Sequence, residues 1–194
     1  MKKLLLTLMC ACLPVVSGVA AADSAANAVP PVNDAVLSEA RAQVQGFGGA
    51  LKAAVKQGME QGGPLAAINV CQLQAPAIAS QHSSGEWQVG RTSLKVRNPD
   101  NAPDAWEASV LESFATRMAA GESAATLEAT LVDNGQVRYM KAIAVEGLCL
   151  ACHGDKLAAP VAQRLAELYP ADQATGYQEG QLRGAFTLVK TLKE

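Results

Sequence analysis

Aromatic side chains are scarce in this sequence, which has three Phe, three Tyr and two Trp among 194 residues. The core must therefore consist mostly of small aliphatic side chains, and the abundance of alanine favours a helix-rich protein. Long apolar runs are also missing beyond residue 22. Because a helix that spans a membrane needs about 20 predominantly apolar residues, we expect no membrane span in the remainder of the chain.

An excess of positive charge is missing as well. The chain has 16 Lys and Arg against 18 Asp and Glu, and without Lys2 and Lys3 the balance is 14 against 18, a net charge of −4. Nucleic acids and anionic lipid surfaces attract proteins through an excess of basic residues. We therefore expect neither of them as the main partner.

The first residues follow the pattern of a secretory signal peptide. A basic start precedes an apolar stretch over 4–16, and three alanines that end at Ala22 fit a small-residue cleavage site. We predict cleavage after Ala22 and a periplasmic location. The remainder is long enough for one domain with its own core, which we predict over 33–194 behind a flexible leader over 23–32.

Cysteine is rare, with five residues in the chain. Cys10 and Cys12 lie within the predicted signal peptide, where a lipoprotein signal is the weaker alternative because the usual small residues do not precede them. The other three, Cys71, Cys149 and Cys152, are an odd number for an oxidising compartment. A simple disulfide framework would therefore leave one thiol over.

Hydrophobic spacing and turn signals predict helices followed by strands. We expect a long amphipathic helix over 33–59, a second helix that begins near Pro64, a third with Asp104 as its N-cap, and a short one over 160–169. Strands are expected over 87–93, 126–133, 136–145 and 184–192, with a hairpin turn at Asn134-Gly135. This order predicts an α+β fold with a small antiparallel sheet flanked by helices.

The second predicted helix carries the isolated thiol. Ile68, Cys71, Ala75 and Ile78 fall on one helical face, which predicts that Cys71 points inward with apolar neighbours. Pro76 cannot donate to the carbonyl four residues earlier, so we expect a kink or a helix end one turn beyond the thiol.

The segment CLACHG contains C-x-x-C-H, the attachment signature of c-type haem. In this signature the thiols of Cys149 and Cys152 add to the haem vinyl groups, and His153 is placed to bind the iron. One alternative is a redox pair or disulfide of the same two cysteines without haem, although the β-α context of a thioredoxin-like site is missing. A zinc site that adds Cys71 and His82 is a weaker alternative.

The second axial position of a haem iron has five candidate ligands in this sequence: Cys71, His82, Met59, Met118 and Met140. His82 lies in a polar segment typical of a solvated histidine, and the methionines fit core positions. For Cys71, an inert buried thiol and an iron ligand are equally open from the pattern alone.

The polar segment GRTSLKVRN supplies candidates for the haem propionates, because guanidinium groups pair well with carboxylates. The candidates are Arg91 and Arg97, with Lys95 and Asn98 beside them. The alternative is that these residues order the loop through caps and turn hydrogen bonds, since Asn98 and Asp104 have the chemistry of turn residues.

Three segments, VCQLQAP at 70–76, GRTSLKVRNPDNAPDAWE at 90–107 and CLACHG at 149–154, resemble the PAS-like haem c family in sequence and order. This family was long catalogued as a domain of unknown function, and it includes stand-alone periplasmic proteins and input domains of sensor kinases. The closing segment GYQEGQLRGAFTLVK is similar as well, so the resemblance covers nearly all of the chain after the signal peptide.

The resemblance implies a PAS-like fold and one covalent haem c. It makes Cys149 and Cys152 the thioether attachments and His153 and Cys71 the axial ligands. We expect a periplasmic monohaem protein that is not an enzyme and that senses redox state or a small ligand, or carries single electrons. The expected partner is an unidentified redox or signalling protein, with a diatomic gas as the ligand of a sensor. A thiol-disulfide oxidoreductase is the alternative function.

Overall fold

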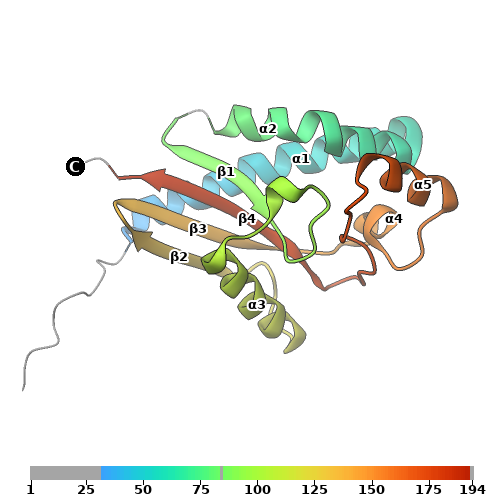
Figure 1. Cartoon of the computed structure of the whole chain (residues 1–194). Helices are drawn as coiled ribbons and strands as arrows, with labels where there is room; N and C mark the ends of the chain where they lie inside the picture. Colours follow the sequence, from blue (N-terminus) through green and yellow to red (C-terminus); the bar gives the residue numbers. More distant parts are fainter. Residues whose placement is uncertain (1–31, 84, 193–194) are drawn as a thin grey trace, which may run out of the picture.

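The computed structural model describes residues 32–83 and 85–192, so the predicted signal peptide and its cleavage site lie outside the described residues. Helices are α1 (Asp34–Asn69), α2 (Ala75–His82), α3 (Ala105–Ala119), α4 (Leu150–His153) and α5 (Ala159–Leu168), and strands are β1 (Trp87–Thr92), β2 (Glu128–Asp133), β3 (Gln136–Ala144) and β4 (Leu182–Thr191) (Figure 1). Within these ranges, no helix combines the length and apolar character that a membrane span requires.

The four strands form one antiparallel sheet in the order β1-β4-β3-β2. The hairpin between β2 and β3 turns at Asn134 and Gly135, whose φ angles of 48° and 71° are the left-handed pair that this turn type requires. Both the α+β class and the predicted hairpin are therefore confirmed.

Two hydrophobic clusters lie on opposite faces of the sheet. On one face, Phe47 and Leu51 of α1 and Ala75 of α2 pack against Trp87 and Leu188 of the sheet. On the other face, α3 packs its own apolar side chains against β3 and β4. The short helices α4 and α5 lie beyond one end of the sheet, near the C-terminal part of α1 (Figure 1).

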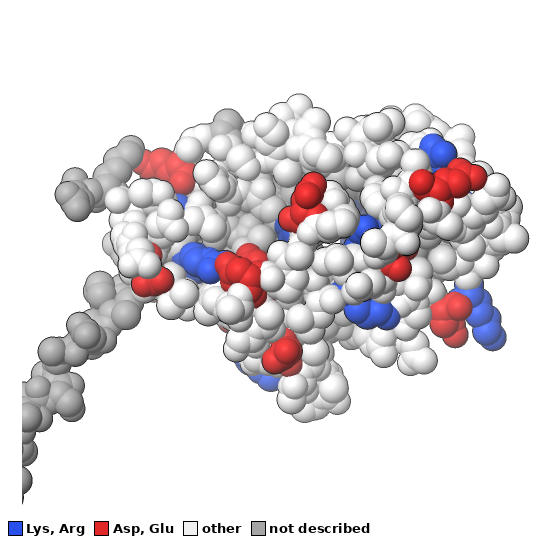
Figure 2. Space-filling view, viewed as in Figure 1, with Lys and Arg blue, Asp and Glu red and all other residues white. Residues whose placement is uncertain are grey.

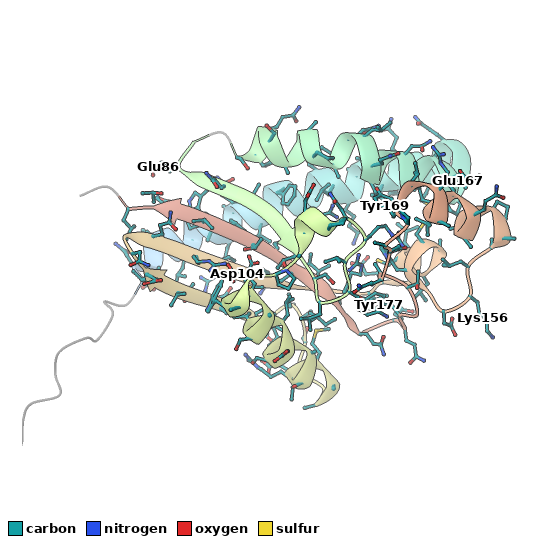
Figure 3. All side chains as sticks on the ribbon, in the orientation of Figure 1. Glu86, Asp104, Lys156, Glu167, Tyr169 and Tyr177 are labelled. Atoms are coloured by element: carbon teal, nitrogen blue, oxygen red, sulfur yellow. The ribbon has the colours of Figure 1, made fainter. Side chains whose placement is uncertain are left out.

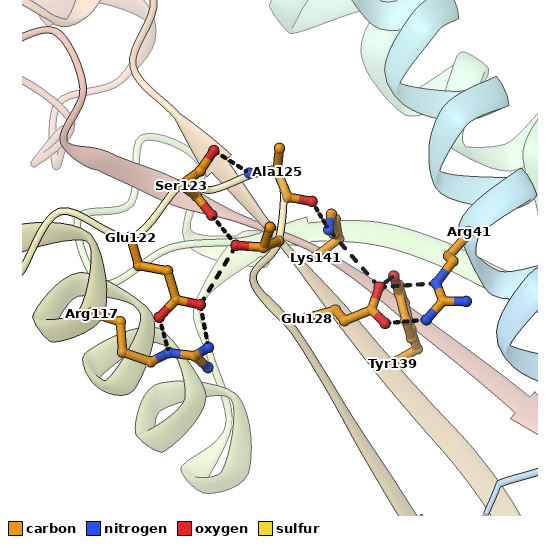
Figure 4. Close-up of polar contacts among 9 residues, drawn as sticks. Arg41, Arg117, Glu122, Ser123, Ala125, Glu128, Tyr139 and Lys141 are labelled. Carbon is orange, nitrogen blue, oxygen red and sulfur yellow. Dashed lines mark hydrogen bonds and ion pairs between the residues drawn. The ribbon is translucent and has the colours of Figure 1, made fainter.

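Ion pairs tie the helices to the sheet at its surface. Arg41 of α1 binds Glu128 of β2, which also accepts a hydrogen bond of 2.7 Å from the Tyr139 hydroxyl (Figure 4). On the molecular face shown in Figure 2, basic and acidic side chains are interspersed, and neither sign gathers into one large patch.

The long first helix is interrupted where the sequence predicted a break. Gly62 and Gly63 have non-helical backbone angles, and the chain resumes its helical course at Pro64. The helix begins at Asp34, capped by the Asn33 side chain, which accepts a hydrogen bond of 2.9 Å from the Ala35 amide.

The chain around Cys71 departs from the regular helix that the sequence predicted. Residues Val70–Gln74 form a π-helical turn, in which the Ala75 amide donates to the Val70 carbonyl five residues earlier. Pro76 stands at the first turn of α2, where it lacks an amide hydrogen and crowds the carbonyl four residues before it. The predicted kink is therefore present, as an opened turn.

The π-helical turn corrects the predicted apolar face. One extra residue rotates the following positions by about 100° relative to an unbroken α-helix. As a result, Ile68 packs against α5, whereas Ala75 and Ile78 pack against the sheet. Cys71 is half-buried, and the expectation that Ile68, Ala75 and Ile78 share one inward face with it is wrong, because Ile68 packs in a different cluster from the other two.

Candidate haem site

The C-x-x-C-H motif lies at the end of the sheet, after β3. Cys149 ends a 3-10 turn (Gly147–Cys149), and Cys152 and His153 belong to the short helix α4. Gly154 is the C-cap of this helix. The position favours glycine, because a Cβ there would lie 2.7 Å from the Leu150 carbonyl oxygen. The chain that returns toward β4 covers the motif, since the Tyr177 amide donates to the His153 carbonyl over 3.0 Å.

His153 is held in one orientation by the same returning chain. Its Nδ1 lies 2.7 Å from the Ala174 carbonyl oxygen, and because a carbonyl only accepts, Nδ1 carries the proton. Burial, followed by the charges of Arg183 and Arg97, lowers the pKa of His153 to about 3. The imidazole is therefore neutral at pH 7, with the Nε2 lone pair free to bind a metal.

Cys71 lies close to the C-x-x-C-H motif, although the two are far apart in the sequence. Burial raises the pKa of Cys152, Arg97 opposes this effect, and the neighbouring thiols Cys71 and Cys149 raise the pKa further. All three cysteines are free thiols and are half-buried. The structure thus gathers Cys71, both motif cysteines and His153 at one end of the sheet, although Cys71 comes from a distant part of the chain.

Arg97 orders the loops around the motif. Its Nε donates to Asp172 over 3.1 Å, and its NH2 group donates to the carbonyls of Cys152 and Ala174 over 2.6 Å and 3.3 Å. Both members of the Arg97–Asp172 ion pair are about nine-tenths buried, with 11% and 10% of their side chains exposed. These contacts match the loop-ordering role considered from the sequence, and binding of a propionate by Arg97 stays a prediction.

Arg91 faces the same end of the sheet from β1. It lies opposite Phe186 of β4 and on the same face of the strand as Val89, which packs toward α1 and α2. Burial lowers the pKa of Arg91, while nearby Cys71 and Tyr169 raise it. Arg91 forms no ion pair with any residue in the described ranges.

Two residues of this end of the sheet were not singled out from the sequence. Tyr177 lies edge-on to His153, with ring centroids 6.3 Å apart, and Figure 3 shows it near α4. The guanidinium of Arg183 lies over the Tyr177 ring at 5.3 Å from its centroid. Both belong to the closing segment that carried the family resemblance, but no local spacing marks either of them as a site residue.

The other candidate ligands have packing roles in this structure. His82 lies at the end of α2, 5.9 Å from the Phe47 ring by centroids, and is half-buried. Met140 is fully buried and Met118 packs beside it, both in the cluster under α3. Met59 is half-buried on α1. Within the described ranges, no three His, Cys, Asp or Glu side chains converge as a bare-metal site would require, so the zinc alternative lacks its ligand cluster.

Apolar side chains surround the motif on two sides. Cys152 packs against Ile68, Val161 and Leu165, and Cys149 packs against a second cluster that contains Val145 and Tyr177. A pocket of about 430 Å³ opens beside the motif, between α5 and the chain near Asp172. Neither Cys71 nor His153 lines this pocket, so it is separate from the place where the candidate ligands meet.

The antiparallel sheet, its long N-terminal helix and the C-x-x-C-H helix at its end define a class, the PAS-like domains that carry a c-type haem signature. A family model described as Tll0287-like matches residues 20–190, and the chain belongs to this family. This assignment confirms the resemblance seen in the sequence.

A comparison with solved structures supports the fold. The chain is similar to the "Crystal structure of the cyanobacterial heme-protein Tll0287", with a TM-score of 0.64 and 24% sequence identity over 84% of this chain and 98% of that chain. At this identity the likeness establishes a shared fold. No curated protein matches the chain.

Proposed function

We propose that this chain is a periplasmic monohaem c-type protein that acts as a redox or small-ligand sensor or as a carrier of single electrons, and not as an enzyme. The observation that carries the proposal is the state of His153 within C-x-x-C-H. A neutral imidazole with Nδ1 fixed on the Ala174 carbonyl presents Nε2 as a metal ligand. The solved relative with the same fold is described as a heme-protein.

The residues present fit a c-type haem. Cys149 and Cys152 would hold it through thioether bonds, and His153 and Cys71 would be the two axial ligands. Apolar side chains around Cys152 and Cys149 limit the access of water to this place. When bound, the haem supplies an iron that changes between the ferric and ferrous states.

Cys71 suits the role of second ligand because it lies near the motif and because the other candidate ligands pack elsewhere. It lies in electrostatic contact with Cys152 and Arg91, whereas His82, Met118 and Met140 are occupied in packing elsewhere. A thiolate ligand donates electron density and favours ferric iron, so the midpoint potential should be low compared with that of a His/Met cytochrome.

Sensing and electron transfer differ in what Cys71 does. A carrier keeps both axial ligands in both oxidation states, whereas a sensor releases one of them on reduction or when a diatomic gas competes for the position. The π-helical turn at Val70–Gln74 supports the sensor, because such turns are frequent at functional sites and differ from an α-helix by a one-residue shift. A separate redox or signalling protein would be the partner.

The thiol-disulfide alternative agrees less well with the site. A reactive cysteine of an oxidoreductase has a lowered pKa, which keeps it partly ionised at neutral pH. Here burial raises the pKa of Cys152. The environment therefore disfavours the thiolate that disulfide exchange requires.

Covalent haem attachment provides the test. The chain would be expressed with its N-terminal segment in cells that contain the cytochrome c maturation machinery, beside the double variant Cys149→Ala/Cys152→Ala. The intact mass of the purified protein should include one haem, and the double variant should lack it. A protein without haem and with two rapidly alkylated motif thiols would support the oxidoreductase instead.

A further inference from the structure

The charges around His153 do not balance among the side chains of the described part of the chain. Four basic residues gather there: Arg91, Lys95, Arg97 and Arg183. Only Arg97 has an acidic partner within the described ranges, namely Asp172. Burial is the largest influence on both Arg91 and Arg183, it lowers the pKa of each, and the nearby positive charges of Arg97 and Arg91 lower that of Arg183 further.

The position of Arg183 depends on an irregularity in the sheet. The register between β3 and β4 shifts between Ile143 and Ala144, which leaves Arg183 as the extra residue of a β-bulge. Bulges change the direction of a side chain and are common beside active sites. Gly184 permits this geometry, because a Cβ at this position would lie 2.4 Å from the Thr92 carbonyl oxygen.

The side chain of Arg183 is also held in place. Its NH1 group donates to the Ser93 hydroxyl over 3.0 Å and to the Lys95 carbonyl over 3.4 Å. The guanidinium plane lies over Tyr177, which in turn lies edge-on to His153. These are uncharged partners, so they orient Arg183 without neutralising it.

A half-buried cation without a counterion is costly, and this cost falls when a carboxylate binds it. A haem has two propionate carboxylates at one edge of the ring. We propose that Arg183, together with Arg91, binds these propionates and thereby sets the orientation of the haem between Cys71 and His153. This assignment rests on the proposed function and adds a residue that the sequence did not point to.

The other two basic residues are less suited to this role. Arg97 is shared between Asp172 and two backbone carbonyls. Lys95 donates to the Thr175 carbonyl and lies over the Tyr177 ring, 4.5 Å from its centroid. A planar guanidinium such as that of Arg183 can also bind a carboxylate through two parallel hydrogen bonds, which an ammonium cannot do.

The test uses the haem-loaded protein and the variants Arg183→Gln, Arg183→Lys and Arg91→Gln. The matched control is Arg117→Gln on α3, which removes the same charge from an exposed ion pair with Glu122. The measurements are the intact mass, the midpoint potential and the propionate bending band in the resonance Raman spectrum. Potentials are measured in acetate and in chloride at equal ionic strength.

Loss of Arg183 should lower the midpoint potential, because a nearby cation favours the ferrous state, and should shift the propionate band to lower frequency. Arg91→Gln should act in the same direction, and Arg117→Gln should leave both measurements unchanged. Arg183→Lys should keep most of the wild-type midpoint potential, since it retains the charge. It should still shift the propionate band, since it loses the paired hydrogen bonds.

Each other outcome overturns the assignment. A haem-loaded Arg183→Gln protein with an unchanged Raman band would remove Arg183 from the propionates and leave the proposed function intact. If this variant fails to mature, an unchanged band in Arg183→Lys leads to the same conclusion. A wild-type potential that changes with acetate concentration would mean that Arg183 binds a free carboxylate. A wild-type protein without covalent haem would overturn both the assignment and the proposed function.

Discussion

Removal of the Arg97 side-chain charge should destabilise the domain strongly. Arg97 and Asp172 are 11% and 10% exposed, and Arg97 also donates to the Cys152 and Ala174 carbonyls. The variant Arg97→Met keeps most of the side-chain volume but leaves the Asp172 carboxylate buried without a cation. The Ala174 carbonyl that holds His153 would lose a charged donor in the same change.

The size of the effect follows from the burial of the pair. Removing one partner of a buried ion pair costs about 3–5 kcal/mol, because the other charge stays desolvated. In a domain of this size, about 1 kcal/mol corresponds to roughly 2–4 °C in Tm. We therefore expect Arg97→Met to lower the Tm by roughly 10 °C. The double variant Arg97→Met/Asp172→Asn should lose less than the sum of the two single variants, since it removes both charges.

Thermal and urea unfolding at pH 7, followed by circular dichroism, would measure these values on the haem-loaded protein. Arg117→Met is the matched control, because its ion pair with Glu122 is exposed and should contribute little to stability. A loss below about 1 kcal/mol for Arg97→Met would mean that the Arg97–Asp172 pair does not act as a buried structural ion pair.

Four further substitutions test other parts of the structure. Gly184→Ala should lower the free energy of unfolding in urea by about 3 kcal/mol, because its Cβ would lie 2.4 Å from a backbone oxygen. Gly49→Ala has open space around its Cβ and should raise the free energy of unfolding by about 0.5–1 kcal/mol. Equal effects of the two substitutions would contradict this expectation. The pKa of Glu128 is lowered to about 2, chiefly by its hydrogen bonds with Arg41, so its carboxylate stabilises the fold above pH 4.5 and this contribution is lost as the pH falls toward 2. Glu128→Gln should remove about 1 kcal/mol of that pH dependence in urea midpoints, and an unchanged acid branch would contradict it. Pro76→Ala restores an amide donor and should convert the π-helical turn to an α-helix, which would weaken the thiolate signature in the ferric EPR spectrum; an unchanged signature would mean that the turn has another cause.

Local signals in the sequence were reliable guides to the elements. Asp104 is the predicted N-cap, and it forms a capping box with Glu107 through reciprocal hydrogen bonds of 3.0 Å and 3.1 Å. The Asn134-Gly135 pair makes the predicted hairpin, and Gly62 and Gly63 break the first helix. In each case the determining atoms lie within four residues along the chain, so spacing and residue type suffice.

Features that depend on distant contacts were not predictable in the same way. The bulge at Arg183 arises because β4 must pair with β3 and also pass close to the Thr92 carbonyl of β1. The acidic partner of Arg97 is Asp172, and no spacing in the sequence connects these two residues. Pro76 did predict a kink, but the α-helical period gave the wrong face for Cys71, because a π-helical turn adds a residue that the pattern does not show.

We propose that Cys71 and His153 would both bind the iron of a covalent haem. The most direct measurement is the optical and low-temperature EPR spectrum of the matured protein and of Cys71→Ala, each oxidised and reduced. We expect a thiolate-type ferric spectrum in the wild-type protein, its loss in Cys71→Ala, and covalent haem in both. An unchanged ferric spectrum in Cys71→Ala would rule out Cys71 as an iron ligand, because Cys71 would then be a packing residue and the second ligand would lie elsewhere.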